Sequence, residues 1–390
     1  MKEQAAGPYK TALPTLYVFA SPNMAHSKEP KHSSLSLQGT VRVRIIDTTS
    51  YIHNLPASFF LSPEFPGLSK LSGPSFSFLI EHPSSRSLLF DLGIRKDWEN
   101  LPPITTRRIE LLQCKVEVQK GVREQLEEHG VDTKRIEGII WSHWHWDHTG
   151  DPSSFEKSTA LIVGPGFMES FTPGYPIDEN GRILQSDMDG RALREITFDQ
   201  SLKIGGFNAF DYFGDGSFYL LDSPGHAIGH MCGLARVTTS PNSFILMGGD
   251  LCHHVGQFRP SAQHPLPTMI SPNPFHGPTA APCPGEIFEH LLSENGHGNP
   301  FFKHGKQVAA DLDAAKESIN KLQKMDGLEE VLVVIAHDRS LLDVVDFFPR
   351  YADDFLEKGW VKKGKWLFLR EFVEAVKNLP APEFDQDHFR

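Results

Sequence analysis

Short apolar runs bounded by turn signals recur along the chain from residue 39 onward. The segments 40–47 (TVRVRIID) and 76–82 (FSFLIEH) carry β-branched or aromatic residues at alternating positions, which is typical of strands. The segment 87–93 (SLLFDLG) is an apolar run that ends at Asp91 and a glycine, which predicts a buried strand followed by a loop. The pattern therefore predicts a chain built around β-sheet.

Four further predicted strands share one feature, because each ends in histidine or aspartate. They are 136–143 (IEGIIWSH), 216–226 (GSFYLLDSPGH), 243–250 (SFILMGGD) and 330–338 (EVLVVIAHD). Ligand sites in folds that alternate strands and helices lie at the ends of strands. We therefore expect these side chains to gather at one place.

Two segments have the periodicity of helices. The first, 118–130 (VQKGVREQLEEHG), stops at a glycine, and the second, 311–325 (DLDAAKESINKLQKM), is amphipathic. Between them, residues 256–309 are rich in Pro, Gly and His and predict a long insertion that could cover a substrate pocket. Residues 1–38 show no periodicity and predict an extended N-terminal arm.

Composition narrows the class of protein. Hydrophobic residues make up 39% of the 390 residues and include 28 Phe, which is enough for a sizeable core. The net charge of −11 argues against an electrostatic nucleic-acid binder. The four cysteines form no CxxC pair and are expected to be reduced thiols, with Cys252 buried. With no secretory signal and no apolar span of about 20 residues, we expect a soluble cytoplasmic protein with no membrane partner.

The segment 141–151 (WSHWHWDHTGD) concentrates metal-ligand residue types. On an extended chain His143 and His145 point to the same side, so they can bind one ion side by side. Asp147 continues the alternation, and a turn at His148 would direct these two residues to a second ion. Imidazole and carboxylate ligands suit Zn²⁺, with Mn, Fe or Co as other candidates.

Four donors are too few for two ions, but His226, Asp250 and His337 at other strand ends supply three more. The carboxylate of Asp250 has two oxygens and can bridge two ions. Two ions about 4 Å apart can hold a bridging hydroxide that attacks a carbonyl, which is hydrolysis without a covalent intermediate. The chain has no GxSxG segment and no cysteine in an activating context, which disfavours a serine or cysteine nucleophile.

The blocks SHWHWDHTGD, DSPGHAIGH, MGGD and IAHD, in this order, resemble the metallo-β-lactamase superfamily over roughly residues 40–345. Within it, the SPGHAIGH block and the single aspartate are similar to N-acyl homoserine lactonases and their longer fungal relatives. The resemblance implies a mixed α/β (α+β) fold, the αββα four-layer sandwich, with two zinc ions per chain. It assigns one ion to His143, His145 and His226, the other to Asp147, His148 and His337, and the bridging position to Asp250.

The resemblance also implies roles around these ligands. Asp147 would double as the proton shuttle to the leaving group, and Asp91 would be a structural residue beneath the ligand loop. His253 stands where the lactonases often carry a tyrosine that polarises the carbonyl, and an imidazole can donate the same hydrogen bond. His230 is expected to support the ligands rather than bind metal. The catalytic domain would span 39–350, followed by a C-terminal extension, 351–390, packed on it.

Other residues near the blocks have less specific interpretations. Phe59 and Phe60 are candidates for lining an apolar acyl pocket, with His254 as a further pocket residue. Trp144 and Trp146 are expected to pack behind the ligand loop. Three histidines of the insertion are expected in solvated loops: His290, His297 and His304.

The sequence leaves several functions open. The leading expectation is a dinuclear zinc hydrolase that opens a lactone, such as an N-acyl homoserine lactone; the alternative is a lactam or cyclic carbamate. A thioesterase of the glyoxalase II type is less favoured, because no basic cluster for a glutathione carboxylate is evident. A non-catalytic metal protein is also less favoured, because structural zinc sites are closed and often rich in cysteine. The partner is thus a small cyclic ester or amide, with a homodimer as the default assembly.

Overall fold

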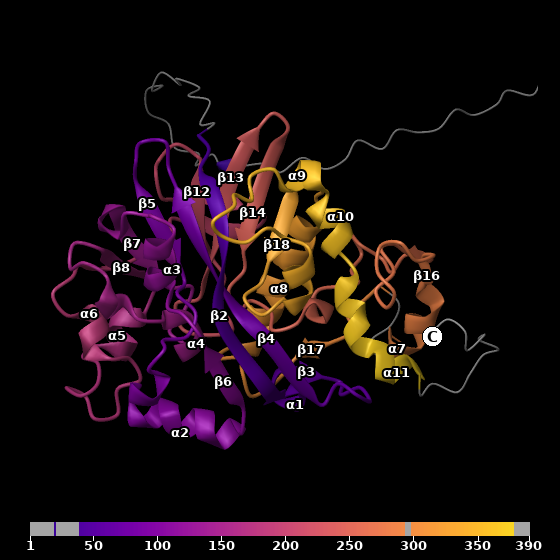
Figure 1. Cartoon of the computed structure of the whole chain (residues 1–390), viewed down its shortest axis with the longest axis horizontal. Coiled ribbons are helices and arrows are strands. Elements are labelled where there is room, and N and C mark those ends of the chain that lie inside the picture. Colours follow the sequence, from indigo (N-terminus) through magenta and orange to yellow (C-terminus); the bar gives the residue numbers. More distant parts are fainter. Residues whose placement is uncertain (1–18, 21–38, 293–297, 378–390) are drawn as a thin grey trace, which may run out of the picture.

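The computed structural model describes residues 19–20, 39–292 and 298–377. Two seven-stranded sheets pack face to face, and helices cover their outer faces (Figure 1). The strand order is β6-β2-β4-β5-β7-β8-β9 in the first sheet and β1-β10-β11-β12-β13-β14-β18 in the second. In the second sheet β14 and β18 run parallel, and its other pairs are antiparallel.

The bounds of the strands are as follows. The first sheet contains β2 Arg42–Pro56, β4 Lys70–Glu81, β5 Ser87–Phe90, β6 Lys115–Val118, β7 Ile136–Ile140, β8 Ala160–Val163 and β9 Leu193–Glu195. The second contains β1 Phe19–Ala20, β10 Leu202–Ile204, β11 Phe207–Asp211, β12 Phe218–Asp222, β13 Met231–Thr239, β14 Asn242–Met247 and β18 Val331–Val334. Two small pairs are β3 Leu61–Ser62 with β17 Lys303–His304, and β15 Met269–Ile270 with β16 Cys283–Pro284.

Most helices are short. They are α1 Ala57–Phe60, α2 Pro103–Leu112, α3 Val122–Glu128, α4 Trp146–Thr149, α5 Phe167–Phe171, α6 Gln185–Met188, α7 Glu289–Leu292, α8 Leu312–Asp326, α9 Phe355–Lys358, α10 Trp360–Gly364 and α11 Val373–Lys377. None of the helices in the described part of the chain is long and apolar enough to cross a membrane.

The core between the sheets follows from the two-residue period of the strands. In the first sheet Phe78 and Phe90 point into the sandwich, whereas Leu79 points to the opposite face. In the second sheet Leu220 points inward and Leu221 outward. Because both faces of each sheet are buried, the strands read as nearly continuous apolar runs.

The outer faces are covered by helices. On the first sheet α3 contributes Leu126 and α5 contributes Phe167. On the second sheet α8 contributes Leu322 and Met325. The four layers form the αββα sandwich that the sequence resemblance implies, so the predicted fold class is confirmed.

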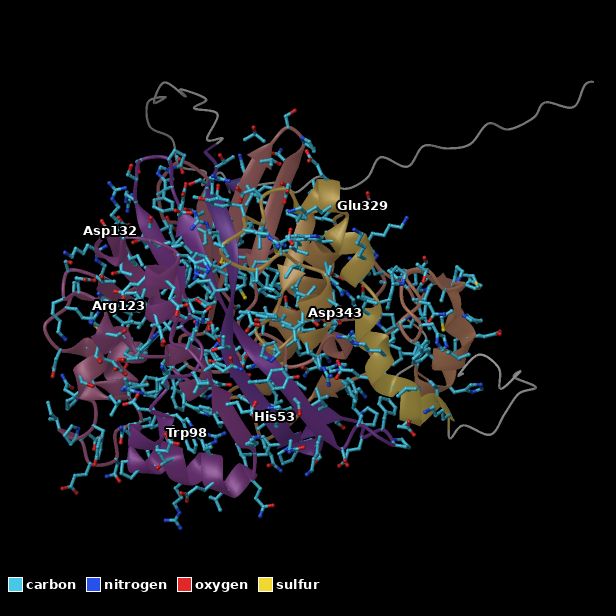
Figure 2. All side chains as sticks on the ribbon, in the orientation of Figure 1. His53, Trp98, Arg123, Asp132, Glu329 and Asp343 are labelled. Carbon is cyan, nitrogen blue, oxygen red and sulfur yellow. The ribbon has the colours of Figure 1, made fainter. Side chains whose placement is uncertain are left out.

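Asp132 and Glu329 are exposed on opposite sides of the molecule in the view of Figure 2.

Several boundaries differ from the sequence prediction. The helix expected at 118–130 begins only at Val122, because residues up to Val118 form β6 against β2 and Gly121 is extended at φ −73° and ψ 158°. The strand expected at 40–47 runs on to Pro56 in β2, with two irregularities in its pairing with β4. The helix expected at 311–325 is α8, in which Asp311 accepts hydrogen bonds from the backbone of Asp313 and Ala314.

The insertion and the C-terminal segment both pack on the second sheet. Phe258, Phe288 and Phe301 of the insertion are fully buried there, together with Phe368 and Phe372 near the C-terminus. Most of the predicted N-terminal arm, His297 and residues 378–390 lie outside the described residues.

Candidate metal centre and substrate cavity

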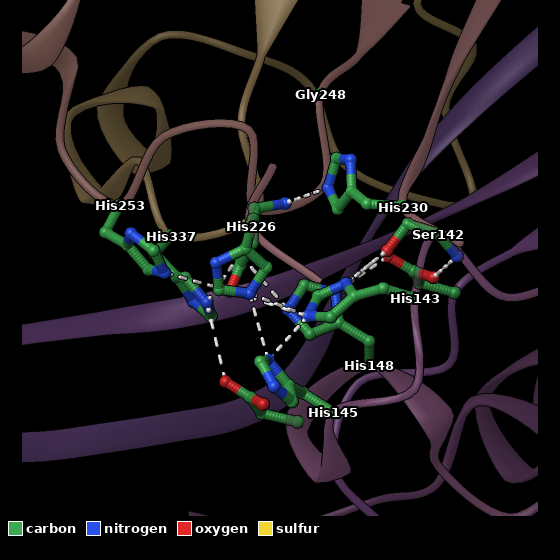
Figure 3. Close-up of polar contacts among 12 residues, drawn as sticks. Ser142, His143, His145, His148, His226, His230, Gly248, His253 and His337 are labelled. Carbon is green, nitrogen blue, oxygen red and sulfur yellow. Dashed lines mark hydrogen bonds and ion pairs between the residues drawn. The ribbon is translucent and has the colours of Figure 1, made fainter. Parts of the chain in front are cut away.

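Four strands deliver the expected donors to one edge of the sandwich. His143 and His145 follow β7, and α4 then turns the chain at Trp146, so that His148 lies on the same side. The remaining donors follow three strands of the second sheet: His226 after β12, Asp250 after β14 and His337 after β18. Figure 3 shows the labelled histidines converging from these separate segments.

The first group consists of His143, His145, His226 and Asp250. Nε2 of His226 lies 3.2 Å from Nε2 of His143 and 2.9 Å from Nδ1 of His145, and the latter two nitrogens are 2.9 Å apart. Burial lowers the pKa of all three rings, that of His145 to about 3. The rings are therefore neutral, and each can offer a lone pair to a cation.

The second group consists of Asp147, His148, Asp250 and His337. Nε2 of His337 lies 3.0 Å from Oδ1 of Asp250 and 3.5 Å from Oδ2 of Asp147. The other ring nitrogen of His337, Nδ1, lies 2.7 Å from the carbonyl oxygen of Pro74. A hydrogen bond from Nδ1 to that carbonyl leaves Nε2 free to act as a ligand.

Asp250 belongs to both groups and faces each with a different oxygen. Oδ2 faces Nε2 of His226 at 3.6 Å, and Oδ1 faces Nε2 of His148 at 3.1 Å. Burial alone would raise the pKa of Asp250, but His337 and His148 lower it well below its usual value. The carboxylate is therefore charged and is placed between the two groups.

The donor set fits two divalent cations. Nε2 of His148 and Oδ1 of Asp250 are buried and close, yet neither makes a hydrogen bond within the described structure. Buried polar atoms normally have a hydrogen-bonding or metal partner, so these two atoms indicate a site for a bound cation. Imidazoles and carboxylates without cysteine suit zinc and its neighbours in a water-accessible site. His143, His145 and His226 would hold one ion, Asp147, His148 and His337 the other, and Asp250 both.

Asp91 organises the ligand loop from below. Its Oδ1 accepts a hydrogen bond from the backbone N–H of Ser142 at 2.6 Å, and its Oδ2 lies 2.8 Å from Nδ1 of His148. The backbone of Asp91 has a φ of 57°, a left-handed conformation that aspartate and asparagine tolerate better than most residues. Asp91 thereby directs Nε2 of His148 toward Asp250.

His230 supports the site without joining it. The backbone N–H of Asp250 donates to Nε2 of His230 at 3.1 Å, and Nδ1 of His230 lies 3.0 Å from the carbonyl oxygen of Ser223. Both ring nitrogens are therefore occupied, and burial lowers the pKa of His230 to about 4. The ring thus contacts the backbone of Asp250, and its role as a supporting residue stays a prediction.

His253 lies at the edge of the first group. Its Nε2 is 3.4 Å from Oδ2 of Asp250, and neither ring nitrogen has a hydrogen-bond partner in the described residues. Its ring lies 4.8 Å from Phe60 and 5.4 Å from His304. His304 is half-buried here, so its assignment to a solvated loop was wrong; β17 pairs with β3 and carries His304 to the site. His290, by contrast, is exposed.

A cavity of about 350 Å³ opens onto these donors. Its walls include the expected pocket residues Phe59, Phe60 and His254. Trp144 packs behind the loop as expected, with its ring centroid 4.7 Å from that of Phe171. Trp144 and Trp146 also line the cavity. Within the described part of the insertion, only Val308 reaches the cavity wall, so the insertion contributes little cover.

The polar residues of the cavity that were missed at the sequence level include Arg108, Arg182 and Glu371. Glu371 belongs to the 3-10 helix Leu367–Phe372, and its Oε1 lies 3.8 Å from Nε2 of His254. Burial raises the pKa of Glu371 to about 7. The C-terminal segment therefore completes the wall of the cavity, and no local pattern marks these residues.

The fold and the donor set define a metal-dependent hydrolase scaffold. Residues 72–238 match the family model of the metallo-beta-lactamase superfamily. Together with the relatives described next, this shows that the chain belongs to the metallo-β-lactamase superfamily.

The chain is similar in sequence to two fungal proteins and in fold to one bacterial structure. It is 44% identical over 358 residues to Gamma-lactamase FDB1 of Fusarium pseudograminearum. The aligned region covers 88% of this chain and 85% of that protein. It is 49% identical over 239 residues to Gamma-lactamase MBL2 of Gibberella moniliformis. This aligned region covers 60% of this chain and 100% of that protein. The fold is similar to that of a variant of AiiA from B. thuringiensis with N-decanoyl-L-homoserine bound at its active site. That match has a TM-score of 0.54 and 17% identity, and covers 80% of this chain and 99% of the other.

Proposed function

We propose that the protein is a metal-dependent hydrolase that opens the ring of a small γ-lactam, with two zinc ions as its metal cofactors. One observation carries the proposal: Asp250 presents one oxygen to each of two donor groups at the base of an apolar cavity. When bound, two divalent ions would polarise the carbonyl and lower the pKa of a water molecule. The choice of a lactam over the lactone first expected rests on the two relatives described as γ-lactamases.

The chain's own residues have distinct tasks in this proposal. Opening a lactam consumes one water: a C–O bond forms at the carbonyl carbon, the C–N bond breaks, and nitrogen leaves as an amine after gaining a proton. Asp147 lines the cavity beside His337 and is the residue placed to pass this proton to nitrogen. His253, whose ring nitrogens make no hydrogen bond within the described residues, is placed to donate a hydrogen bond to the carbonyl oxygen.

The cavity selects the body of the substrate. Phe59, Phe60 and Trp144 give it aromatic walls, and its volume of about 350 Å³ has room for a bicyclic ring. A five-membered lactam fused to a benzene ring satisfies both conditions. A lactone of the same shape is the second candidate, because the same donors would polarise an ester carbonyl.

A matched pair of substrates tests the proposal. 2-Indolinone is a benzo-fused γ-lactam, and 2-coumaranone is the lactone of the same size and shape. We expect the zinc-loaded protein to open 2-indolinone, measured by chromatography of the amino acid formed, and to lose this activity with a chelator. Opening of 2-coumaranone alone, above its spontaneous rate, would replace the lactam by the lactone. Opening of neither ring, by protein that holds two zinc ions, would contradict the proposal for benzo-fused rings.

Asp250→Asn tests the shared ligand. The variant keeps the shape of the side chain but loses the charge, so we expect it to fold and to hold less than two zinc ions per chain. We expect kcat for 2-indolinone to fall at least about 100-fold. Asp132→Asn is the matched control: it is exposed, and asparagine retains the oxygen that caps the backbone N–H of Lys134. Full activity and two metals in Asp250→Asn would contradict the role of Asp250.

A further inference from the structure

Two arginines from separate segments line the rim of the cavity. Arg108 lies on α2, and Arg182 lies in the loop before α6. The hydroxyl of Thr105, also on α2, donates to the carbonyl oxygen of Arg182 at 3.3 Å and ties the two segments together. Figure 1 shows α2 at the lower edge of the molecule, below α4, which carries the ligand loop. Both arginines line the same cavity as Asp147 and Asp250 of the candidate metal centre.

Neither guanidinium makes an ion pair with a carboxylate in the described part of the chain. Other arginines of this protein do: Arg86 pairs with Glu137 at 2.7 Å and Arg259 with Asp326 at 2.5 Å. Both side chains are exposed, and Arg107 and Arg339 of the same cavity also make no ion pair within the described residues. Several cations at one cavity, without carboxylate partners among the described residues, suggest that an external anion completes them.

Aromatic residues of the cavity wall hold both guanidinium groups in place. The guanidinium carbon of Arg108 lies 5.9 Å from the ring centroid of Phe59, and that of Arg182 lies 5.3 Å from Trp144. These distances are within the range of cation–π contacts. Guanidinium groups that already lie on aromatic faces lose less conformational entropy when they bind a further group.

The two positive charges also disfavour each other. Partial desolvation at the rim lowers the pKa of Arg108, and Arg182 lowers it further, while Asp147 opposes the shift more weakly. A bound anion would reduce this repulsion, because it would attract both cations at once. An arginine pair is also suited to carboxylate, sulfate and phosphate groups, which accept parallel hydrogen bonds.

We propose that Arg108 and Arg182 form an anion-binding subsite that recognises a carboxylate or similar anionic group carried by the substrate outside the ring that is opened. The inference rests on the proposed function, which places the scissile carbonyl at Asp250 and the apolar body between Phe59 and Trp144. The substrate class is then an anionic aromatic lactam. No basic cluster for a glutathione carboxylate was evident in the sequence, but the tertiary structure places these two arginines, from distant segments, on one cavity.

A binding experiment tests the subsite without any turnover. The probe is naphthalene-2-sulfonate, and 2-naphthalenemethanol is its neutral counterpart. We expect the zinc-loaded protein to bind the sulfonate more tightly in calorimetry, and the preference to shrink about tenfold in Arg108→Gln and in Arg182→Gln. Arg135→Gln makes the same charge change at a distant exposed arginine and should keep the wild-type preference. No preference for the sulfonate, or one unchanged in both rim variants, would overturn the inference.

A kinetic experiment separates the subsite from the proposed function. The substrates are 2-indolinone and its 5-carboxylate. In the Arg108→Gln/Arg182→Gln variant we expect the ratio of kcat/KM for the carboxylate over the neutral lactam to fall about tenfold or more, mainly through KM. An unchanged ratio with both lactams hydrolysed would overturn the subsite and leave the proposed function intact. Hydrolysis of neither would contradict the proposed function, and the sulfonate titration would still decide whether the subsite exists.

Discussion

Nδ1 of His148 lies 2.8 Å from Oδ2 of Asp91, and both side chains are buried. Burial by itself lowers the pKa of His148, but Asp250 and Asp91 raise it well above its usual value. One imidazole thus connects a carboxylate beneath the ligand loop to the carboxylate shared by the two donor groups. The orientation of the candidate metal centre therefore depends on a residue that touches neither substrate nor metal.

Asp91→Asn is expected to weaken metal binding rather than to unfold the protein. Asparagine tolerates the φ of 57° at this position, so the backbone is not strained. Its amide cannot accept both from Ser142 and from His148 as a carboxylate does, so His148 loses its fixed orientation. We expect zinc affinity to fall about 10- to 100-fold, measured by competition with a chromophoric chelator. Affinity equal to that of the wild type would contradict this role.

His253→Phe is expected to separate packing from chemistry. The ring packs 4.8 Å from Phe60, and phenylalanine preserves this contact while removing two nitrogens that make no hydrogen bond within the described residues. We expect the melting temperature to stay the same or rise, and kcat for 2-indolinone to fall about 100-fold. His253→Tyr restores a hydrogen-bond donor and should recover part of the rate. If His253→Phe keeps full activity, His253 has no part in the reaction.

Gly164→Ala is expected to displace the loop that carries His226. A Cβ atom at this position would lie 1.9 Å from the carbonyl oxygen of Gly229, which is backbone and cannot rotate away. We expect a loss of about 1–3 kcal/mol of stability and fewer zinc ions per chain, measured by denaturant unfolding and metal analysis. Gly121→Ala is the control, because no atom lies within 4 Å of its Cβ and its φ is −73°. Equal metal content in both variants would contradict the expectation.

Asp326 is expected to make the free energy of unfolding depend on pH. Burial would raise its pKa, but Arg259 and Lys365 lower it to about 2. The folded pKa lies below the ordinary 3.8, so the carboxylate stabilises the fold above pH 4 and this contribution is lost as the pH falls toward 2. This lowering of the pKa of Asp326 corresponds to about 2 kcal/mol of the free energy of unfolding.

The measurement compares Asp326→Asn with the wild type, both freed of metal by a chelator. We expect the variant to be less stable in denaturant unfolding at pH 7, and the difference to shrink as the pH falls below 4. Asp132→Asn, at an exposed position, should follow the wild type at every pH. A difference that stays constant between pH 7 and pH 3 would argue against the charge of Asp326 as its cause.

The strands were predictable because their signals are local. Alternation of apolar residues marks β4, and a continuous apolar run ending in donors marks β14 and β18. The start of α3 was misplaced, because Val118 and its neighbours pair with β2, a contact between distant segments. Pairing of this kind overrides local helical periodicity.

The metal-ligand candidates were predictable for a related reason. His143 and His145 are two residues apart on an extended segment, so their chemistry and direction can be inferred from the sequence alone. Arg108 and Arg182 could not be recognised in this way. Their proximity depends on α2 docking against a loop more than 70 residues later, through Thr105.

The sequence by itself determined the number and chemical type of the donors, and the order of strands that end in them. Only the tertiary structure decided which oxygen of Asp250 faces which group, that His304 reaches the site through the pairing of β17 with β3, and that aromatic and arginine residues share one cavity. The physical reason is the range of the interactions. Periodicity and ligand chemistry act within a few residues, whereas a site at the edge of two packed sheets is assembled by contacts between segments far apart in the chain.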